Sequence, residues 1–361
     1  MKRFVTTFMF ALLSTAFWSH QLQAQFTTTF AKNVTPGQQN GIYYSLPQTM
    51  LRLDFVIDEI KMEKGPLSDY ASNYLDMADV VEYETTEYKL VDVSMTSVVS
   101  PDPNALFFVT LATGRGSGKV QFDVMPNGII RSAGVGVVAE NENHIIPKVE
   151  EPKCCVEKSE PNYEFINLLS AGKSNAQLAK EVADKIEEIK KDKYFLIRGD
   201  EGMAQNSETF NAMYQKLDAL EKEYTSLLIG KRVAKRVVKS VYVVPNKEVP
   251  TQSVAKFSES NGLTLGTAGS GSMITVQTLS LGTTAAINAP SQSAVESMSY
   301  ENKLFYRIPD MAQVTVSCGN QALLEDRVTI NQLGALLMAP LSNTTLVFDT
   351  ETGQIIQMQM H

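Results

Sequence analysis

Two stretches near opposite ends of the chain share one pattern, and this repeat restricts the fold more than any other feature. Residues 43–55 read YYSLPQTMLRLDF and residues 305–317 read FYRIPDMAQVTVS: an aromatic pair, a polar residue, Leu or Ile, Pro, and a strand-like run. A second pair follows in the same order, with VQFDVMPNGII at 120–130 and LVFDTETGQII at 346–356. Because both repeats keep their order, the sequence predicts an internal duplication of one β-module.

The rest of the chain divides into β-rich ends and a helical centre. Residues 41–138 contain runs rich in β-branched and aromatic residues, and the chain returns to this composition after Gly230. Between these parts, Ser174 and Gln177 form a capping box before apolar residues at helical spacing. A second apolar stripe begins after Ser207, and Gly230 ends it. The two stripes predict an antiparallel pair of helices.

These patterns predict an α+β fold that is mostly β. We expect two related antiparallel β-modules with an inserted antiparallel helical hairpin. The predicted order is a signal peptide at 1–24, an N-terminal β-module at 25–139, an acidic linker with prolines at 140–163, the helical hairpin at 164–230, and a C-terminal β-module with Gly- and Ser-rich loops at 231–361.

The first residues predict export. Lys2 and Arg3 precede the apolar run 4–18, and Ala24 stands before an expected cleavage point in front of Gln25. No segment approaches the roughly 18 consecutive apolar residues of a membrane helix, and no cysteine near the cleavage point offers a lipid anchor. We expect an exported periplasmic or outer-membrane-associated protein that is not a lipoprotein and has no direct membrane span.

The charge makes nucleic acid an unexpected partner. Loss of Lys2 and Arg3 with the signal changes the formal net charge from −8 to −10, whereas nucleic-acid binders present a basic surface. The basic stretch 231–239 runs into SVYVVP, so we interpret it as a strand whose charged edge discourages aggregation. The alternative for this stretch is a patch for anionic lipid.

The glycine-rich stretch TGRGSGKV at 113–120 has the composition of a phosphate-binding loop. Such a loop needs a helix after it, because the helix N-terminal amides hold the anion. Here Lys119 stands where the third glycine of G-x-G-x-x-G belongs, and an alternating strand follows. We interpret the stretch as a β-hairpin turn and expect no nucleotide.

Residues for histidine chemistry are scarce. His20 lies in the predicted signal, His361 is the last residue, and His144 lies in the predicted linker. This distribution disfavours a histidine-based catalytic device and a zinc site built from several histidines. We therefore predict no catalytic residue, no metal ligand and no cofactor.

The three cysteines allow one disulfide. A bridge between the neighbours Cys154 and Cys155 would strain the backbone. In an exported protein, the candidate disulfide therefore joins one of them, Cys155, to Cys318. Three unpaired thiols are the alternative.

The carboxylates and tyrosines leave a sugar-cleaving enzyme open. Forty Asp and Glu residues could include the acid pair of a glycosidase, but the single tryptophan, Trp18, lies in the predicted signal. Packing at the start of the repeated strands explains the tyrosines there better than a ligand platform does. The candidate interaction residues at this position are Tyr44, Pro47, Tyr306 and Pro309.

The repeated segments also carry a family resemblance. The stretch 44–81, the segment YRIPDMAQVTV at 306–316 and the segment FDTETGQI at 348–355 resemble domain of unknown function 4831, an uncharacterised family of exported Bacteroidetes proteins. The resemblance covers nearly the whole mature chain and implies this location and architecture. It implies no activity and brings no catalytic residues.

We therefore expect a non-enzymatic envelope protein that scaffolds or binds components of a periplasmic or outer-membrane assembly. Its β-edges and helical hairpin would offer surfaces for strand addition or helix docking. The alternative is a carboxylate-dependent hydrolase or a glycan-binding module that acts on envelope polysaccharide. The expected partners are other envelope proteins, with glycan as the alternative ligand.

Overall fold

The computed structural model describes residues 26–35, 37, 40–74, 80–111, 120–135, 172–198 and 207–361. Within them the chain is mostly β, with several antiparallel sheets. The predicted signal peptide, the linker 140–163 and the glycine-rich residues 113–119 lie outside the described residues, as do His144 and Cys155. The strand that ends at Leu111 and the strand that begins at Val120 lie in different sheets, so the predicted β-hairpin around the glycine-rich stretch is wrong. No helix in this described part is long and apolar enough to cross a membrane.

The secondary structure consists of long and short strands and two long helices. The strands are β1 (Phe26–Phe30), β2 (Gly41–Glu63), β3 (Thr85–Leu111), β4 (Val120–Val124), β5 (Ile130–Val135), β6 (Lys231–Val243), β7 (Thr251–Ser258), β8 (Gly262–Leu265), β9 (Ser272–Ser280), β10 (Tyr300–Glu301), β11 (Lys303–Cys318), β12 (Gln321–Pro340), β13 (Thr344–Phe348) and β14 (Ile355–Met360). The helices are the 3-10 turns η1 (Ala31–Asn33) and η2 (Ser68–Tyr70), and α1 (Ala71–Tyr74), α3 (Asn175–Arg198), α4 (Ser207–Ile229) and α5 (Gln292–Glu296).

The strands form three sheets, two of which combine strands from both predicted β-modules. The first sheet has the order β10-β1-β3-β2-β6, the second β12-β11-β9-β7-β8, and the third β14-β13-β5-β4. Strands from 231–361 thus complete sheets that strands from 25–139 begin: β6 pairs with β2, β10 with β1, and β13 with β5. The sequence did not predict these pairings, because the alternation of a strand reveals its covered face and not its neighbours.

Two apolar clusters hold the sheets together. The first includes Phe107 of β3 and Phe305 of β11, whose stacked rings have centroids 4.4 Å apart. The second packs Leu53 and Phe55 of β2 against Val314 of β11. These β2 residues are two apart because one face of the strand lies on the core.

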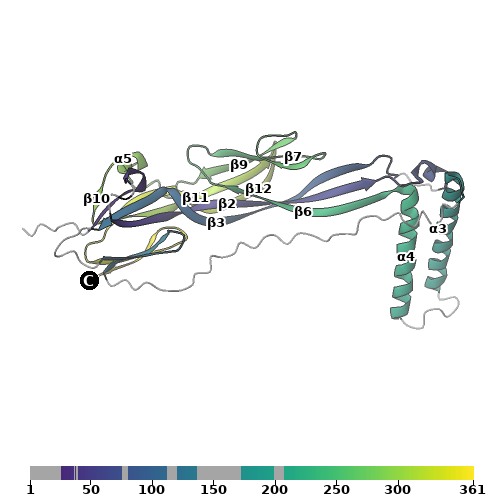
Figure 1. The fold of residues 1–361 in the computed structure, drawn as a ribbon, viewed down its shortest axis with the longest axis horizontal. Coiled ribbons are helices and arrows are strands. Elements are labelled where there is room, and N and C mark those ends of the chain that lie inside the picture. Colours follow the sequence, from purple (N-terminus) through teal and green to yellow (C-terminus); the bar gives the residue numbers. More distant parts are fainter. Residues whose placement is uncertain are drawn as a thin grey trace, which may run out of the picture.

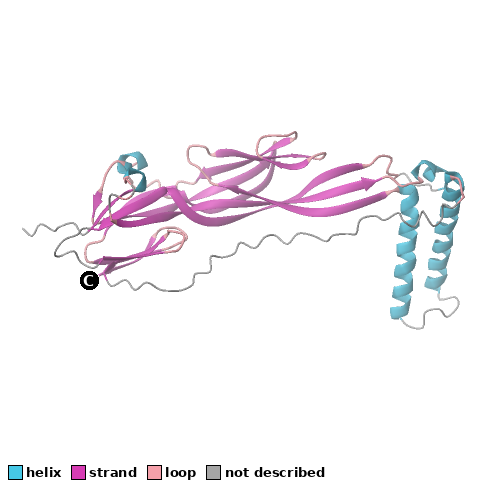
Figure 2. Ribbon diagram, viewed as in Figure 1, coloured by secondary structure: helices cyan, strands magenta, loops and turns pink. Residues whose placement is uncertain are grey.

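A ribbon of β2, β3 and β6 extends beyond these clusters (Figure 1). β2 has 23 residues, so at about 3.3 Å per residue it spans roughly 75 Å. The ribbon carries α3 and α4 at one end of an elongated molecule, and the C-terminus lies near the other end (Figure 1, Figure 2). The long helices are therefore held far from the first apolar cluster.

The connection between β2 and β3 holds the end of α4. The amides of Leu67 and Val81 donate hydrogen bonds to the carbonyls of Leu227 and Ile229, both at 2.9 Å. These bonds satisfy carbonyl groups that the end of a helix leaves unpaired. Gly230 then turns the chain from α4 into β6 with a φ of +86°.

Replacing Gly230 with Ala is expected to lower the free energy of unfolding by about 2 kcal/mol. The new Cβ would lie 2.5 Å from the Glu63 carbonyl oxygen, at a φ of +86° that disfavours L side chains. Urea unfolding measures the change. The matched control is Gly172→Ala, because Gly172 has a φ of +78° and nothing within 4 Å of its Cβ position. Equal losses in the two variants would contradict the crowding argument.

Candidate functional site

The helices α3 and α4 pack side by side at the end of the ribbon (Figure 1). The predicted capping box is present, with Gln177 N donating to Ser174 Oγ at 3.4 Å and Ser174 N donating to Gln177 Oε1 at 3.1 Å. Lys193 of α3 donates hydrogen bonds to Asp218 and Glu221 of α4, both at 2.8 Å. The apolar stripe of α3 is buried against α4. The other sides of α3 therefore face outward.

The ion pairs between α3 and α4 predict that the helix pair loses stability in acid. Hydrogen bonds from Lys193 and Lys222 lower the pKa of Asp218 to about 2. A carboxyl group whose pKa is lower in the folded state stabilises that state above its unfolded pKa of about 4, and this stabilisation is lost as the pH falls toward 2. We expect the helical circular dichroism to weaken with acid in this window.

An NMR titration of the Asp218 carboxyl group measures its pKa directly. The Asp218→Asn variant should show a smaller loss of helical signal between about pH 4 and pH 2. An unchanged acid response in that variant would assign the effect to other groups.

The C-terminal part of α3 exposes more apolar surface than its packing on α4 requires. Residues 194–197 read YFLI, and Leu196 is buried, whereas Tyr194, Phe195 and Ile197 are 57%, 49% and 61% exposed. A helix that is apolar on several sides is normally covered on those sides. We call Tyr194, Phe195 and Ile197 the α3 aromatic surface, and it is the candidate docking site.

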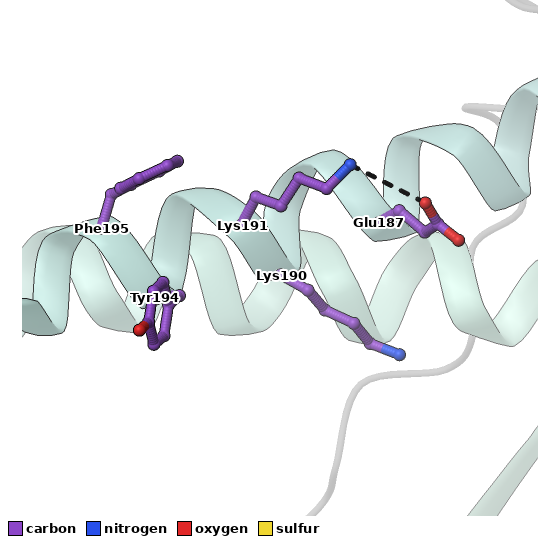
Figure 3. A pocket seen from close by; sticks show the side chains of 5 residues that line it. All are labelled: Glu187, Lys190, Lys191, Tyr194 and Phe195. Carbon is purple, nitrogen blue, oxygen red and sulfur yellow. Dashed lines mark ion pairs between the residues drawn. The ribbon is translucent and has the colours of Figure 1, made fainter.

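A shallow hollow lies along this part of α3 (Figure 3). Its lining consists of Glu187, Lys190, Lys191, Tyr194 and Phe195. Lys191 Nζ lies 3.9 Å from Glu187 Oε2, and the rings of Tyr194 and Phe195 are 6.2 Å apart. The hollow holds about 290 Å³ and is open to solvent, whereas small-molecule pockets typically bury most of the surface of their ligand. It therefore suits a side chain of a protein partner better than a substrate.

The four predicted interaction residues lie on β2 and β11. Tyr44 is fully buried, burial raises the pKa of its phenol, and its hydroxyl accepts a hydrogen bond from Phe305 N at 3.0 Å. The carbonyl of the buried Pro47 accepts a hydrogen bond from Arg307 Nη1 at 2.9 Å. The structure thus brings the two repeated segments together and gives Tyr44 and Pro47 a packing role, while contact with a partner stays a prediction. The half-buried members are Tyr306 and Pro309.

A buried polar network joins the sheets beside these residues. Arg307 Nη2 donates to Asp102 Oδ2 at 2.8 Å, and the two side chains are only 7% and 3% exposed. Thr49 N donates to Gln332 Oε1 at 3.0 Å, while Gln332 Nε2 donates back to Thr49 O at 2.9 Å. Asn331 N donates to Thr49 Oγ1 at 3.1 Å. These bonds connect β11 to β3 and β12 to β2, so the network serves the contact between sheets.

Two other buried carboxylates bear on the hydrolase alternative. Asp54 accepts a hydrogen bond from Arg52 Nε at 2.9 Å. Burial alone would raise the pKa of Asp310, but hydrogen bonds from Ser280 and Thr283 lower it below its usual value. The general acid of a glycosidase needs a raised pKa, so Asp310 is unsuited to that role. Across the ranges that the structure describes, no group of three or more His, Cys, Asp or Glu residues could hold a metal ion.

Cys318 ends β11 in a half-buried position, and burial raises the pKa of its thiol. It forms no disulfide with any residue that the structure describes. Cys155 lies outside those residues. The disulfide between Cys155 and Cys318 therefore stays a prediction.

Comparison with known proteins identifies the family of this chain. Residues 40–356 match the family described as Domain of unknown function (DUF4831). The chain belongs to the DUF4831 family. The match begins just before β2 and ends within β14, so the DUF4831 region includes strands of all three sheets and both long helices. No curated protein and no solved structure matches the chain.

The interaction residues predicted from the sequence did not include the α3 aromatic surface. The sequence contains a signal for this surface. Residues 194–197 are four consecutive apolar residues, and a stripe that faces one neighbouring helix needs only about one of them. The exposed fraction of each side chain shows which of the four do not pack within the fold. Only the tertiary structure shows that Leu196 is buried while Tyr194, Phe195 and Ile197 are exposed.

Proposed function

We propose that this DUF4831 protein is a non-enzymatic scaffold or binding component of an exported envelope assembly. Its ribbon would hold the α3 aromatic surface away from the sheets, where a partner protein binds it. Export, a periplasmic or outer-membrane-associated location and an origin in Bacteroidetes are parts of this proposal. The positively charged and apolar N-terminal residues support export.

The α3 aromatic surface is the observation that carries the proposal. Tyr194, Phe195 and Ile197 are each about half exposed or more, and they lie on the helix pair at the end of the ribbon (Figure 1). Aromatic side chains are enriched among the residues that dominate binding energy at protein interfaces. Exposed clusters of large apolar side chains mark sites of interaction. A partner that covers these side chains would remove them from water.

We also propose that the two β-modules arose by duplication and that α3 and α4 form a hairpin between them. In the pairing of β2 with β3, residues 102–105 lie opposite the single residue Leu46. In the pairing of β11 with β12, residues 331–334 lie opposite the single residue Pro309. The first irregularity lies directly before the repeated proline and the second lies at it, and such bulges are conserved within families. The shared irregularity supports a common origin of the two pairs of strands.

The test is crosslinking in cells at native expression, followed by purification of the tagged chain and mass spectrometry. We expect a defined set of envelope proteins, and we expect the Tyr194→Ala, Phe195→Ala double variant to recover them at least about tenfold less well. The matched control is Tyr83→Ala, because Tyr83 is 74% exposed and lies outside the helices. This control should recover the same partners as the unchanged chain.

Two outcomes would reject docking through α3. The first is recovery of the chain alone, and the second is equal recovery of partners by the double variant. Saturable binding of the chain to an envelope polysaccharide, retained in the double variant, would favour the glycan-binding alternative.

A further inference from the structure

β6 forms the edge of the first sheet and confirms the predicted strand. It pairs with β2 along its whole length, and no other described strand pairs with its second side. Residues 231–239 lie on the ribbon, whereas Val241 and Val243 reach the second apolar cluster. Alternate backbone N–H and C=O groups of an edge strand point away from its sheet. β6 therefore presents a row of backbone groups that an added strand could bind.

The charge of β6 restricts what could pair with it. The strand has five Lys or Arg residues and no acidic residue, in a chain whose formal net charge is −8. Lys235, Arg236 and Lys239 are exposed. Like charges on facing strands are destabilising, so a second copy of β6 is a poor partner. An acidic segment is attracted to the same edge.

The pairing of β6 with β2 shows how carboxylates match this strand. Asp58 of β2 lies directly opposite Arg236, and its two oxygens accept hydrogen bonds from the guanidinium at 2.7 and 3.0 Å. Glu59 lies opposite Lys235. Pairs of opposite charge across neighbouring strands stabilise the sheet. A strand with repeated carboxylates on the outer side of β6 would repeat this arrangement.

We propose that the outer side of β6 binds an extended acidic segment of a partner protein by strand addition. Backbone hydrogen bonds would supply much of the affinity. Lys235 would select carboxylates, because Arg236 is paired with Asp58 and Lys239 Nζ donates to Leu263 O at 2.8 Å. This site lies on the ribbon and does not depend on the α3 aromatic surface. Failure at one of the two sites therefore leaves the other testable.

The test uses the full chain and a fluorescein-labelled peptide that alternates Glu and Val. About ten residues, at about 3.3 Å each, cover 231–239. We expect fluorescence anisotropy to show binding that weakens with salt. We also expect amide hydrogen exchange to slow at the alternate residues of 231–239 whose amides point away from β2. The Lys235→Glu variant should bind the peptide about fivefold more weakly. The control Lys216→Glu makes the same charge change at an exposed position of α4 and should bind within about twofold of the unchanged chain.

Four results would overturn the proposal. Equal binding of a peptide that alternates Lys and Val, or equal weakening by Lys216→Glu, would show that strand addition at this edge is not selective. Slowed exchange on α3 in place of β6 would assign the acidic segment to the helices. Protection in the protein alone of those amides of 231–239 that point away from β2 would show that another segment of this chain, or a second copy, occupies the edge.

Discussion

Replacing Asp102 with Ala is expected to lower the free energy of unfolding by about 3–5 kcal/mol. The carboxylate accepts a hydrogen bond from Arg307 at 2.8 Å, and both side chains are almost fully buried. Its removal would leave the guanidinium in the interior with the Pro47 carbonyl as its remaining described hydrogen-bond acceptor. An unpaired buried charge is far more costly than a lost surface ion pair. Urea unfolding followed by circular dichroism measures the change.

Two further variants separate this explanation from a general sensitivity to mutation. Asp58→Ala breaks an ion pair with Arg236, whose side chain is 55% exposed, and should cost at most about 1 kcal/mol. The double variant Asp102→Leu, Arg307→Met removes both buried charges and should be less destabilised than Asp102→Ala alone. A double variant that is as unstable as the single one would contradict the cost assigned to the unpaired guanidinium.

Replacing Phe305 with Ala is expected to cost about 3–5 kcal/mol of unfolding free energy. The ring is 1% exposed and stacks on Phe107, with centroids 4.4 Å apart and planes within 10°. Truncation would leave a cavity between β3 and β11, which belong to different sheets. Because these sheets meet through this cluster, we expect the whole β-structure to lose stability, and thermal unfolding measures this loss.

The matched control for this substitution is Phe195→Ala on α3. Phe195 is 49% exposed, so its truncation should change the free energy of unfolding by less than about 0.5 kcal/mol. We thus expect opposite effects of the two substitutions on stability, because Phe305 packs in the core and Phe195 is proposed to contact a partner. A loss of stability in Phe195→Ala comparable to that in Phe305→Ala would show that the α3 aromatic surface is part of the fold.

Local patterns in the sequence predicted local structure well. Ser174 and Gln177 form the expected capping box, and the apolar stripe of α3 is buried. The stretch that begins at Lys231 forms a long strand. Each of these features depends on residues close together along the chain, because caps and periodicity act within a few turns or a few strand residues.

Contacts between distant residues were beyond such patterns. Arg307 and Asp102 are 205 positions apart, and nothing in either neighbourhood specifies the other. Tyr44 has the same local signature whether it faces a partner or the core, and only the approach of β11 buries it. The exposure of Tyr194 and Phe195 likewise depends on which side of α3 the helix α4 covers.

The sequence by itself determined the family, the mostly β composition, the long helices and the strand character of the basic stretch. The tertiary structure alone decided that β6 completes a sheet with β2 and that α3 leaves an aromatic surface uncovered. It also decided that the repeated segments meet, through the bonds from Phe305 to Tyr44 and from Arg307 to Pro47. The physical reason is that the period of a strand or helix specifies which face is apolar. The neighbour that covers this face is selected by packing and hydrogen bonds over the whole chain.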